Sequence, residues 1–203
     1  MKFRLTYAGK LQGASRDNKR PRHKHEVRRA FYPQLRALWR SNPLLKELKD
    51  PVLEGPVAVN LGNRVSREEA LARDFSQSGY RFVPLVTTAL SLTCRIKILF
   101  LRPDPTGALI RSGDIDNRLK TLLDALRKPK DLDECGGYDT PLPGEDSFFC
   151  LLEDDSLITE VNVETDMLLE ALPNGGEAND ARLVITVSLR PSTVTWGNIG
   201  FGN

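Results

Sequence analysis

Apolar and polar residues alternate along three segments of the chain, and this period of two predicts strands with one buried face. The segments are residues 2–7, 89–101 and 182–189. In the second of them most intervening residues are polar, and the apolar face would carry Leu90, Leu92, Cys94, Ile96, Ile98 and Phe100. Residues 81–86 and 157–169 are two further strand candidates.

Two other segments place apolar residues three and four positions apart, which predicts amphipathic helices. The first is expected over residues 27–41, with Pro33 either kinking it or delaying its start. The second is expected over residues 116–127. In addition, Ser66 is followed three residues later by Glu69, a pattern typical of a capped helix start, so a short polar helix is expected there.

The remaining segments lack regular periodicity. Residues 16–25 are dense in basic side chains and contain a proline, so we expect a loop or mobile arm within a basic stretch of about 10–29. Residues 128–151 are expected to form an insertion loop. No repeat or linker divides the chain, which predicts a single α+β domain over residues 1–190, with a mixed or largely antiparallel sheet packed with helices, and a flexible tail at 191–203.

Composition excludes several classes of protein. With 40% apolar residues, the 203-residue chain can bury a core. Its longest uncharged apolar run, residues 82–94, is too short for a membrane helix, which needs about 20 residues. The first residues alternate and form no apolar leader, so we expect a protein that is not secreted. Three cysteines without a C-x-x-C pair favour a reducing compartment such as the cytoplasm, and only two histidines argue against a histidine triad.

Charge is distributed unevenly along the chain. Residues 1–50 contain 14 Lys and Arg against 4 Asp and Glu, whereas the remaining residues contain 15 against 23. A basic cluster can bind the phosphates of a nucleic acid, although a solvated helix face would look the same. The candidates for DNA backbone contact are Arg16, Lys19, Arg20, Arg22, Lys24, Arg28 and Arg29.

The segment that points most strongly to chemistry is residues 113–126. Asp114 and Asp116 lie two residues apart just where a helix is expected to start, and if the chain is extended there both carboxylates project to one side, a geometry that suits a divalent metal. Lys120 lies one turn further on and could meet a phosphate held there. Helix capping and an ordinary ion pair explain the same residues without a site.

A second group of acidic residues interrupts an apolar run at residues 151–158. Glu153, Asp154 and Asp155 are consecutive, and a buried strand tolerates such charges only if they are paired, exposed or bound to metal. A turn is the alternative explanation for this group.

Together these residues resemble the RusA-type Holliday junction resolvases. The family pattern is an Asp-x-Asp-Asn, a Lys four residues after the second Asp, an Asp-Ala-Leu later in the same helix, and an Asp-Asp pair that opens a strand. All of these positions carry the expected residue types in this chain, namely Asp114, Asp116, Asn117, Lys120, Asp124, Ala125, Leu126, Asp154 and Asp155. The resemblance is strong over residues 112–127 and 152–161.

The resemblance implies a metal-dependent endonuclease of bacterial or phage origin that resolves four-way DNA junctions. It implies that Asp114, Asp116 and Asp155 bind Mg²⁺ or Mn²⁺ with support from Asp154, that Lys120 contacts the scissile phosphate, and that the enzyme is a homodimer. It does not identify the dimer surface, for which the strand at 157–169 and the helix at 27–41 are both candidates.

Two departures from the family bear on the substrate more than on the chemistry. The insertion at about residues 128–151 is absent from the usual pattern, and the region before residue 80 is longer than in compact members. Two other readings therefore stay open. One is a branched-DNA-binding protein with the same fold and no turnover, and the other is an interaction protein whose basic arm binds acidic partners.

Overall fold

Residues 1–15, 18–47, 51–53, 64–77, 79–103, 114–169, 179–195 and 197–202 are described by a computed structural model of the chain. Within these ranges the strands form sheets of four, three and two strands. The two larger sheets and their helices share one continuous set of buried apolar side chains. The fold is therefore a single α+β domain with mixed sheets, as the sequence predicted. None of the helices in the described ranges is long and apolar enough to cross a membrane.

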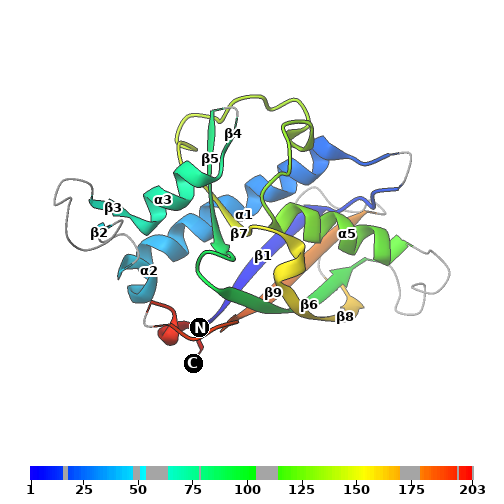
Figure 1. Cartoon of the computed structure of the whole chain (residues 1–203). Helices are drawn as coiled ribbons and strands as arrows, with labels where there is room; N and C mark the ends of the chain where they lie inside the picture. The colour runs from blue at the N-terminus through cyan, green and yellow to red at the C-terminus, as the bar shows by residue number, and fades with distance from the viewer. Residues whose placement is uncertain are drawn as a thin grey trace.

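The four-stranded sheet has the order β1-β9-β6-β8. β9 is antiparallel to both of its neighbours, whereas β8 runs parallel to β6. Alternate residues of β6 and β9 are buried, which confirms the period of two, because α1 and α5 both lie over one face of this sheet (Figure 1). The bounds are β1 (Lys2–Lys10), β6 (Leu92–Arg102), β8 (Ile158–Met167) and β9 (Asp180–Pro191).

The three-stranded sheet has the order β4-β5-β7, with β5 (Tyr80–Val86) parallel to β7 (Phe148–Leu152) and β4 (Ser76–Gln77) antiparallel to β5. Every residue of β7 is buried. Most of these residues fall in the predicted insertion loop at 128–151, and that prediction is wrong because a strand buried on both faces shows a continuous apolar run and no alternation. A third, two-stranded sheet pairs β2 (Pro51–Leu53) with β3 (Arg64–Ser66).

Helix α1 (Pro21–Ser41) contributes the predicted apolar stripe to the core. Phe31, Leu35 and Trp39 of this stripe are almost completely buried. Pro33 lies inside the helix on its exposed side, so the proline ring does not displace a core residue.

The start of α1 differs from the expectation. The helix begins at Pro21, inside the segment expected to be a loop or mobile arm. A proline at the first helical position loses no hydrogen bond, since that N–H has no partner within a helix. His25 and Arg28 are buried, so packing against the rest of the domain extends the helix beyond its apolar stripe.

The other helices are short, apart from α5. Ser66 Oγ accepts a hydrogen bond from the Glu69 N–H at 3.0 Å at the start of α3, which confirms the predicted cap. The bounds are α2 (Pro43–Glu47), α3 (Arg67–Asp74), α5 (Asp114–Leu126), and the 3₁₀ turns η1 (Asp133–Cys135), η2 (Asp155–Leu157) and η3 (Ile199–Gly202).

The segment at 128–147 is irregular, as expected, but it packs tightly against α1. Tyr138 stacks near His25, with ring centroids 5.3 Å apart, and Cys135 is buried. Tyr80 donates a hydrogen bond to the carbonyl of Tyr138 at 3.0 Å, which ties the segment to β5. The insertion therefore belongs to the domain core.

The end of the chain also packs, although the sequence predicted a flexible tail. Phe201 is buried, and its carbonyl accepts a hydrogen bond from the Met1 amino group. Asn198 is buried as well and donates to the carbonyls of Leu90 at 3.1 Å and Thr193 at 2.9 Å. These contacts hold residues 197–202 against the start of the four-stranded sheet.

Gly136 offers a test of how closely the insertion approaches α1. Its φ is +63°, and a Cβ at this position would lie 2.2 Å from the backbone N and Cα of Arg22. Gly136→Ala is therefore expected to lower the free energy of unfolding by about 3 kcal/mol, measured by denaturant titration. Gly137→Ala is the matched control, because Gly137 has a φ of +90° but no atom within 4 Å of the added Cβ. Equal losses in the two variants would contradict the packing argument.

Candidate functional site

Helix α5 presents two residues of the acidic motif, Asp116 and Lys120, on its outward face. Leu122, Ala125 and Leu126 are buried on the opposite face and anchor the helix to the core. Asp116 and Lys120 are exposed. They lie one turn apart, since a helix repeats every 3.6 residues, and so project from the same side of α5.

The side chains of Asp116 and Lys120 make no hydrogen bond or ion pair with any residue in the described ranges. The carboxylate and the ammonium group are therefore available to a ligand in solution. Asp114 is the first residue of α5 and precedes Asp116 by two positions. Its side chain is not among those that the structure describes.

The second acidic group serves the turn between β7 and β8. Asp154 Oδ1 accepts a hydrogen bond from the Ser156 N–H at 3.0 Å and so caps η2, and its carboxylate lies 3.7 Å from Lys130 Nζ. Hydrogen bonds from the side chain and backbone of Ser156 lower the pKa of Asp154. Glu153 accepts from the Thr88 N–H at 2.8 Å. Turn formation therefore accounts for these two acids.

The two acidic groups lie at opposite ends of α5. Arg127, just after the helix, forms a bridge with Leu152, and the Lys128 N–H donates to the Leu152 carbonyl at 2.8 Å. Asp154 and Asp155 therefore lie beside the C-terminal end of α5, which Figure 1 shows next to the β7–β8 connection. Asp116 is about 15 Å away along the helix axis, at 1.5 Å per residue.

The positions of these acidic residues determine which of them can bind the same divalent cation. No group of three or more His, Cys, Asp or Glu side chains in the described part of the chain is placed to hold a metal ion. Mg²⁺ commonly takes only one or two carboxylates and keeps several waters. The extended chain that would turn Asp114 and Asp116 to one side is not found, because α5 already begins at Asp114 and residues two apart in a helix do not face each other. Asp116 is therefore the described acid at the start of α5, and Asp154 and Asp155 lie apart from it.

Asp124, the third acid of the motif, is occupied by neighbouring cations. Its carboxylate lies 2.6 Å from Lys24 Nζ and 3.3 Å from the Arg127 guanidinium, and all three side chains are mostly buried. Arg127 also forms an ion pair with Glu134 at 2.8 Å. The acid therefore joins α5 to α1 and to the insertion.

The predicted DNA-contacting residues divide into two groups. Lys19 and Arg22 are exposed, and Arg20 is half-buried. Arg16 lies outside the described residues. A polyanion can therefore reach Lys19, Arg20 and Arg22, and it can reach the exposed Lys120 as well.

The other predicted contacts are engaged within the protein. Lys24 pairs with Asp124, and Arg29 pairs with Glu145 at 3.2 Å while lying over the Tyr138 ring at 4.0 Å. Arg28 is buried and donates to backbone carbonyls at the end of α5. Spacing along the sequence did not distinguish these residues from the exposed ones, because all of them belong to one basic run.

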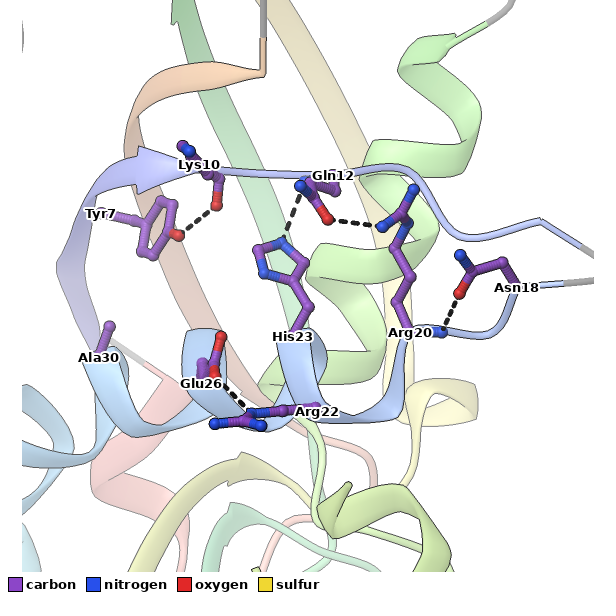
Figure 2. A pocket seen from close by; sticks show the side chains of 9 residues that line it. All are labelled: Tyr7, Lys10, Gln12, Asn18, Arg20, Arg22, His23, Glu26 and Ala30. Carbon is purple, nitrogen blue, oxygen red and sulfur yellow. Dashed lines mark hydrogen bonds and ion pairs between the residues drawn. The ribbon is translucent and has the colours of Figure 1, made fainter. Parts of the chain in front are cut away.

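A cavity of about 560 Å³ lies between the end of β1 and the first turns of α1 (Figure 2). We call it the α1 pocket, and its walls include Tyr7, Arg20, Arg22, His23, Glu26 and Ala30. The basic cluster in the sequence predicts Arg20 and Arg22 as contacts to the DNA backbone. The sequence predicts Tyr7 only as part of a strand, so it does not indicate that the three residues share a cavity. The pocket exists because α1 begins at Pro21 and runs back alongside β1.

Comparisons of the chain with protein-family models, with curated proteins and with solved structures found no match.

Breaking the pair between α1 and α5 tests the structural role of Asp124. Asp124→Ala leaves Lys24 mostly buried without its partner, so the free energy of unfolding is expected to fall by about 3 kcal/mol. The double variant Lys24→Met with Asp124→Met removes both charges and is expected to recover most of that loss. Denaturant titration measures both, and an Asp124→Ala variant as stable as the wild type would contradict the role.

Proposed function

We propose that the protein is a metal-dependent endonuclease that cleaves branched DNA such as four-way junctions. What carries the proposal is the outward face of α5, where the side chains of Asp116 and Lys120 are exposed one turn apart and make no hydrogen bond or ion pair with the described residues. Carboxylate and ammonium groups without a partner among the described residues are suited to act on a phosphate. The order and spacing of four residues resemble the RusA-type pattern, namely Asp114, Asp116, Asn117 and Lys120. This resemblance is the reason for proposing phosphodiester cleavage.

Asp114 and Asp116 are the residues that would hold Mg²⁺ or Mn²⁺, because hard cations prefer carboxylate oxygens. When bound, such an ion supplies a metal-bound water of lowered pKa and neutralises charge on the phosphate oxygens. Lys120 donates hydrogen bonds to a non-bridging oxygen of the same phosphate and stabilises its developing negative charge. Asp155 stays outside this arrangement and contributes negative charge near Arg127.

DNA contact in this proposal falls to exposed cations. Lys19 and Arg22 lie near the start of α1, and the loop that precedes α1 packs on α5, where the Ala14 N–H donates to Thr121 Oγ1 at 3.0 Å. One phosphate backbone can therefore meet cations from both helices. Such contacts position the backbone without reading bases.

A second candidate function is a branched-DNA-binding protein without turnover. The observation that favours it is the distance between the acidic groups, since Asp154 serves η2 and both Asp154 and Asp155 lie beside the far end of α5. This function predicts junction binding without metal-dependent cleavage. The hypothesis of an interaction protein whose basic arm binds acidic partners predicts neither binding nor cleavage of the junction.

The proposed enzyme acts as a homodimer, because two-fold symmetry gives two sites for two strands of a junction. We assign the dimer surface to the edge strand β8. Val161 and Met167 on this strand are 43% and 44% exposed, and β8 is the last strand of the four-stranded sheet within the described residues. Glu160 and Glu164 pair with Arg95 and Lys97 of β6, so two β8 strands can approach without confronting these acids.

Cleavage of a synthetic four-way junction tests the function directly. Wild-type protein is expected to introduce paired symmetric nicks only with Mg²⁺ or Mn²⁺, and Asp116→Asn is expected to reduce the rate by at least about a hundredfold. Binding of the junction by Asp116→Asn should be equal or tighter, because the substitution removes negative charge near the phosphates.

Linear duplex and replication-fork substrates serve as specificity controls in that assay, and Asp139→Asn, an exposed aspartate of the 128–147 segment, is the matched charge control. Wild-type cleavage rates in Asp116→Asn would overturn the assigned site. Tight junction binding by the wild type without cleavage in either metal would establish the second candidate instead.

The dimer surface is tested by placing a charge on the β8 edge. Val161→Lys is expected to convert the dimer to a monomer, as measured by light scattering coupled to size-exclusion chromatography, because a lysine at a strand edge opposes edge-to-edge pairing. Val194→Lys is the control, since Val194 is 67% exposed and lies away from β8 in sequence and sheet position. A dimer that survives Val161→Lys would exclude this edge.

A further inference from the structure

Arg20 forms a rigid basic wall of the α1 pocket. Its Nε donates to the Gly13 carbonyl at 2.9 Å, and its Nη1 donates to Gln12 Oε1 at 2.6 Å (Figure 2). These two bonds use only part of the five-donor guanidinium, and no other hydrogen bond of this side chain involves a described residue. The remaining donors are preorganised for an anion.

His23 adds a neutral donor to the same cavity. Its Nε2 accepts a hydrogen bond from the Gln12 N–H at 3.0 Å, which places the ring proton on Nδ1. Figure 2 shows that Nδ1 faces the space between Tyr7 and Glu26. Burial lowers the pKa of His23, so the ring is neutral near pH 7 and keeps this donor.

Tyr7 supplies an aromatic wall whose hydroxyl group is already engaged. Its ring lies 5.9 Å from the Phe31 ring, and its hydroxyl donates to the Lys10 carbonyl at 2.5 Å. Burial, with the negative charges of Glu26 and Asp180, raises the pKa of Tyr7 to about 12, so the ring stays uncharged. A flat, neutral ring at the side of a cavity is suited to stacking.

Glu26 provides an acceptor on the α1 side of the cavity. Its Oε1 lies 3.2 Å from Arg22 Nε, and this pair is mostly exposed at the rim. Its Oε2 has no hydrogen bond to a described residue, so it remains an acceptor for donor groups of a ligand. Ala30, one turn further along α1, lines the cavity with a small, exposed side chain.

The volume of the α1 pocket limits which ligands can contact all of these groups at once. A volume of about 560 Å³ is several times that of a bare phosphate ion and falls in the range of cavities that take small organic ligands, about 300–1,000 Å³. The lining combines a guanidinium wall, an aromatic wall and an acceptor carboxylate. A nucleotide has the three matching parts, which are a phosphate, a flat base and base-edge N–H groups.

We propose that the α1 pocket binds one unpaired nucleotide of a DNA substrate, with its phosphate at Arg20 and its base against Tyr7. Glu26 Oε2 and His23 Nδ1 then face the edge of the base. This inference rests on the proposed function for the identity of the ligand as DNA, and it adds a recognition site for a nucleotide that has left the stack. A base inside a continuous duplex cannot enter a cavity of this kind, whereas unpaired bases at a branch point can.

The test is equilibrium dialysis of the metal-free protein against dAMP, dCMP, dGMP and dTMP, with inorganic phosphate and deoxyadenosine as separate arms. At least one monophosphate is expected to bind saturably, and about tenfold or more tightly than phosphate or nucleoside alone, because both walls contribute. Equal binding of inorganic phosphate would reduce the site to an anion site and overturn the nucleotide proposal. Absence of saturable binding in all arms would overturn it as well.

Two variants locate the binding in the pocket. Ala30→Leu puts a larger side chain on the lining of the cavity without changing charge and with little loss of helix propensity, and is expected to weaken monophosphate binding about tenfold or more. Arg20→Ala is expected to weaken it by about ten- to a hundredfold. Lys46→Ala, an exposed cation on α2 outside the pocket, is the control and should bind as the wild type does. Unchanged affinity in Ala30→Leu would overturn the assignment.

The result is separable from the nuclease assay. Monophosphate binding is measured without metal and without cleavage, so a protein that binds in the pocket but cuts no junction contradicts the proposed function alone. A protein that cuts junctions through Asp116 but binds no nucleotide contradicts the pocket alone.

Discussion

The arrangement of the helices depends on the hydrogen bonds that the buried Arg28 guanidinium donates. It donates to the carbonyls of Arg127 at 2.8 Å and Asp124 at 2.9 Å, and these groups at the end of α5 have no partner within the helix. A buried charge is stable only where its hydrogen bonds are satisfied. The same end of α5 is joined to β7 through the bridge between Arg127 and Leu152, so α1, α5 and the second sheet are held in place together.

Local sequence patterns predicted the elements whose signals are local. The alternation in β6 and β9, the apolar stripe of α1 and the Ser66 cap all describe how one segment meets its immediate surroundings, and the structure confirms them. β7 has no alternation because both its faces are covered, and the start of α1 depends on buried contacts with distant residues. Neither property is visible within a short window of sequence.

The same limit applies to the candidate site. The order and spacing of Asp114, Asp116 and Lys120 lie within two turns of one helix, so helical geometry alone places Asp116 and Lys120 on a common face. The relation of Asp155 to that group depends on how the segment between α5 and β8 folds. This segment includes β7 and approaches the helix at its other end, where Arg127 and Lys130 meet the acids. The α1 pocket, between two elements separated by a basic loop, is likewise a tertiary property.

The pairing of β1 with β9 has a consequence for how the chain folds during synthesis. β1 occupies a sheet edge and its hydrogen-bonded partner is β9, with residues 2–10 opposite residues 180–188. At about 5–20 residues per second, the ribosome releases β9 on the order of ten to thirty seconds after β1. Throughout that interval the first strand has no partner, and β6 also lacks its central neighbour. The four-stranded sheet therefore closes as a late event in translation, when nearly the whole domain has emerged.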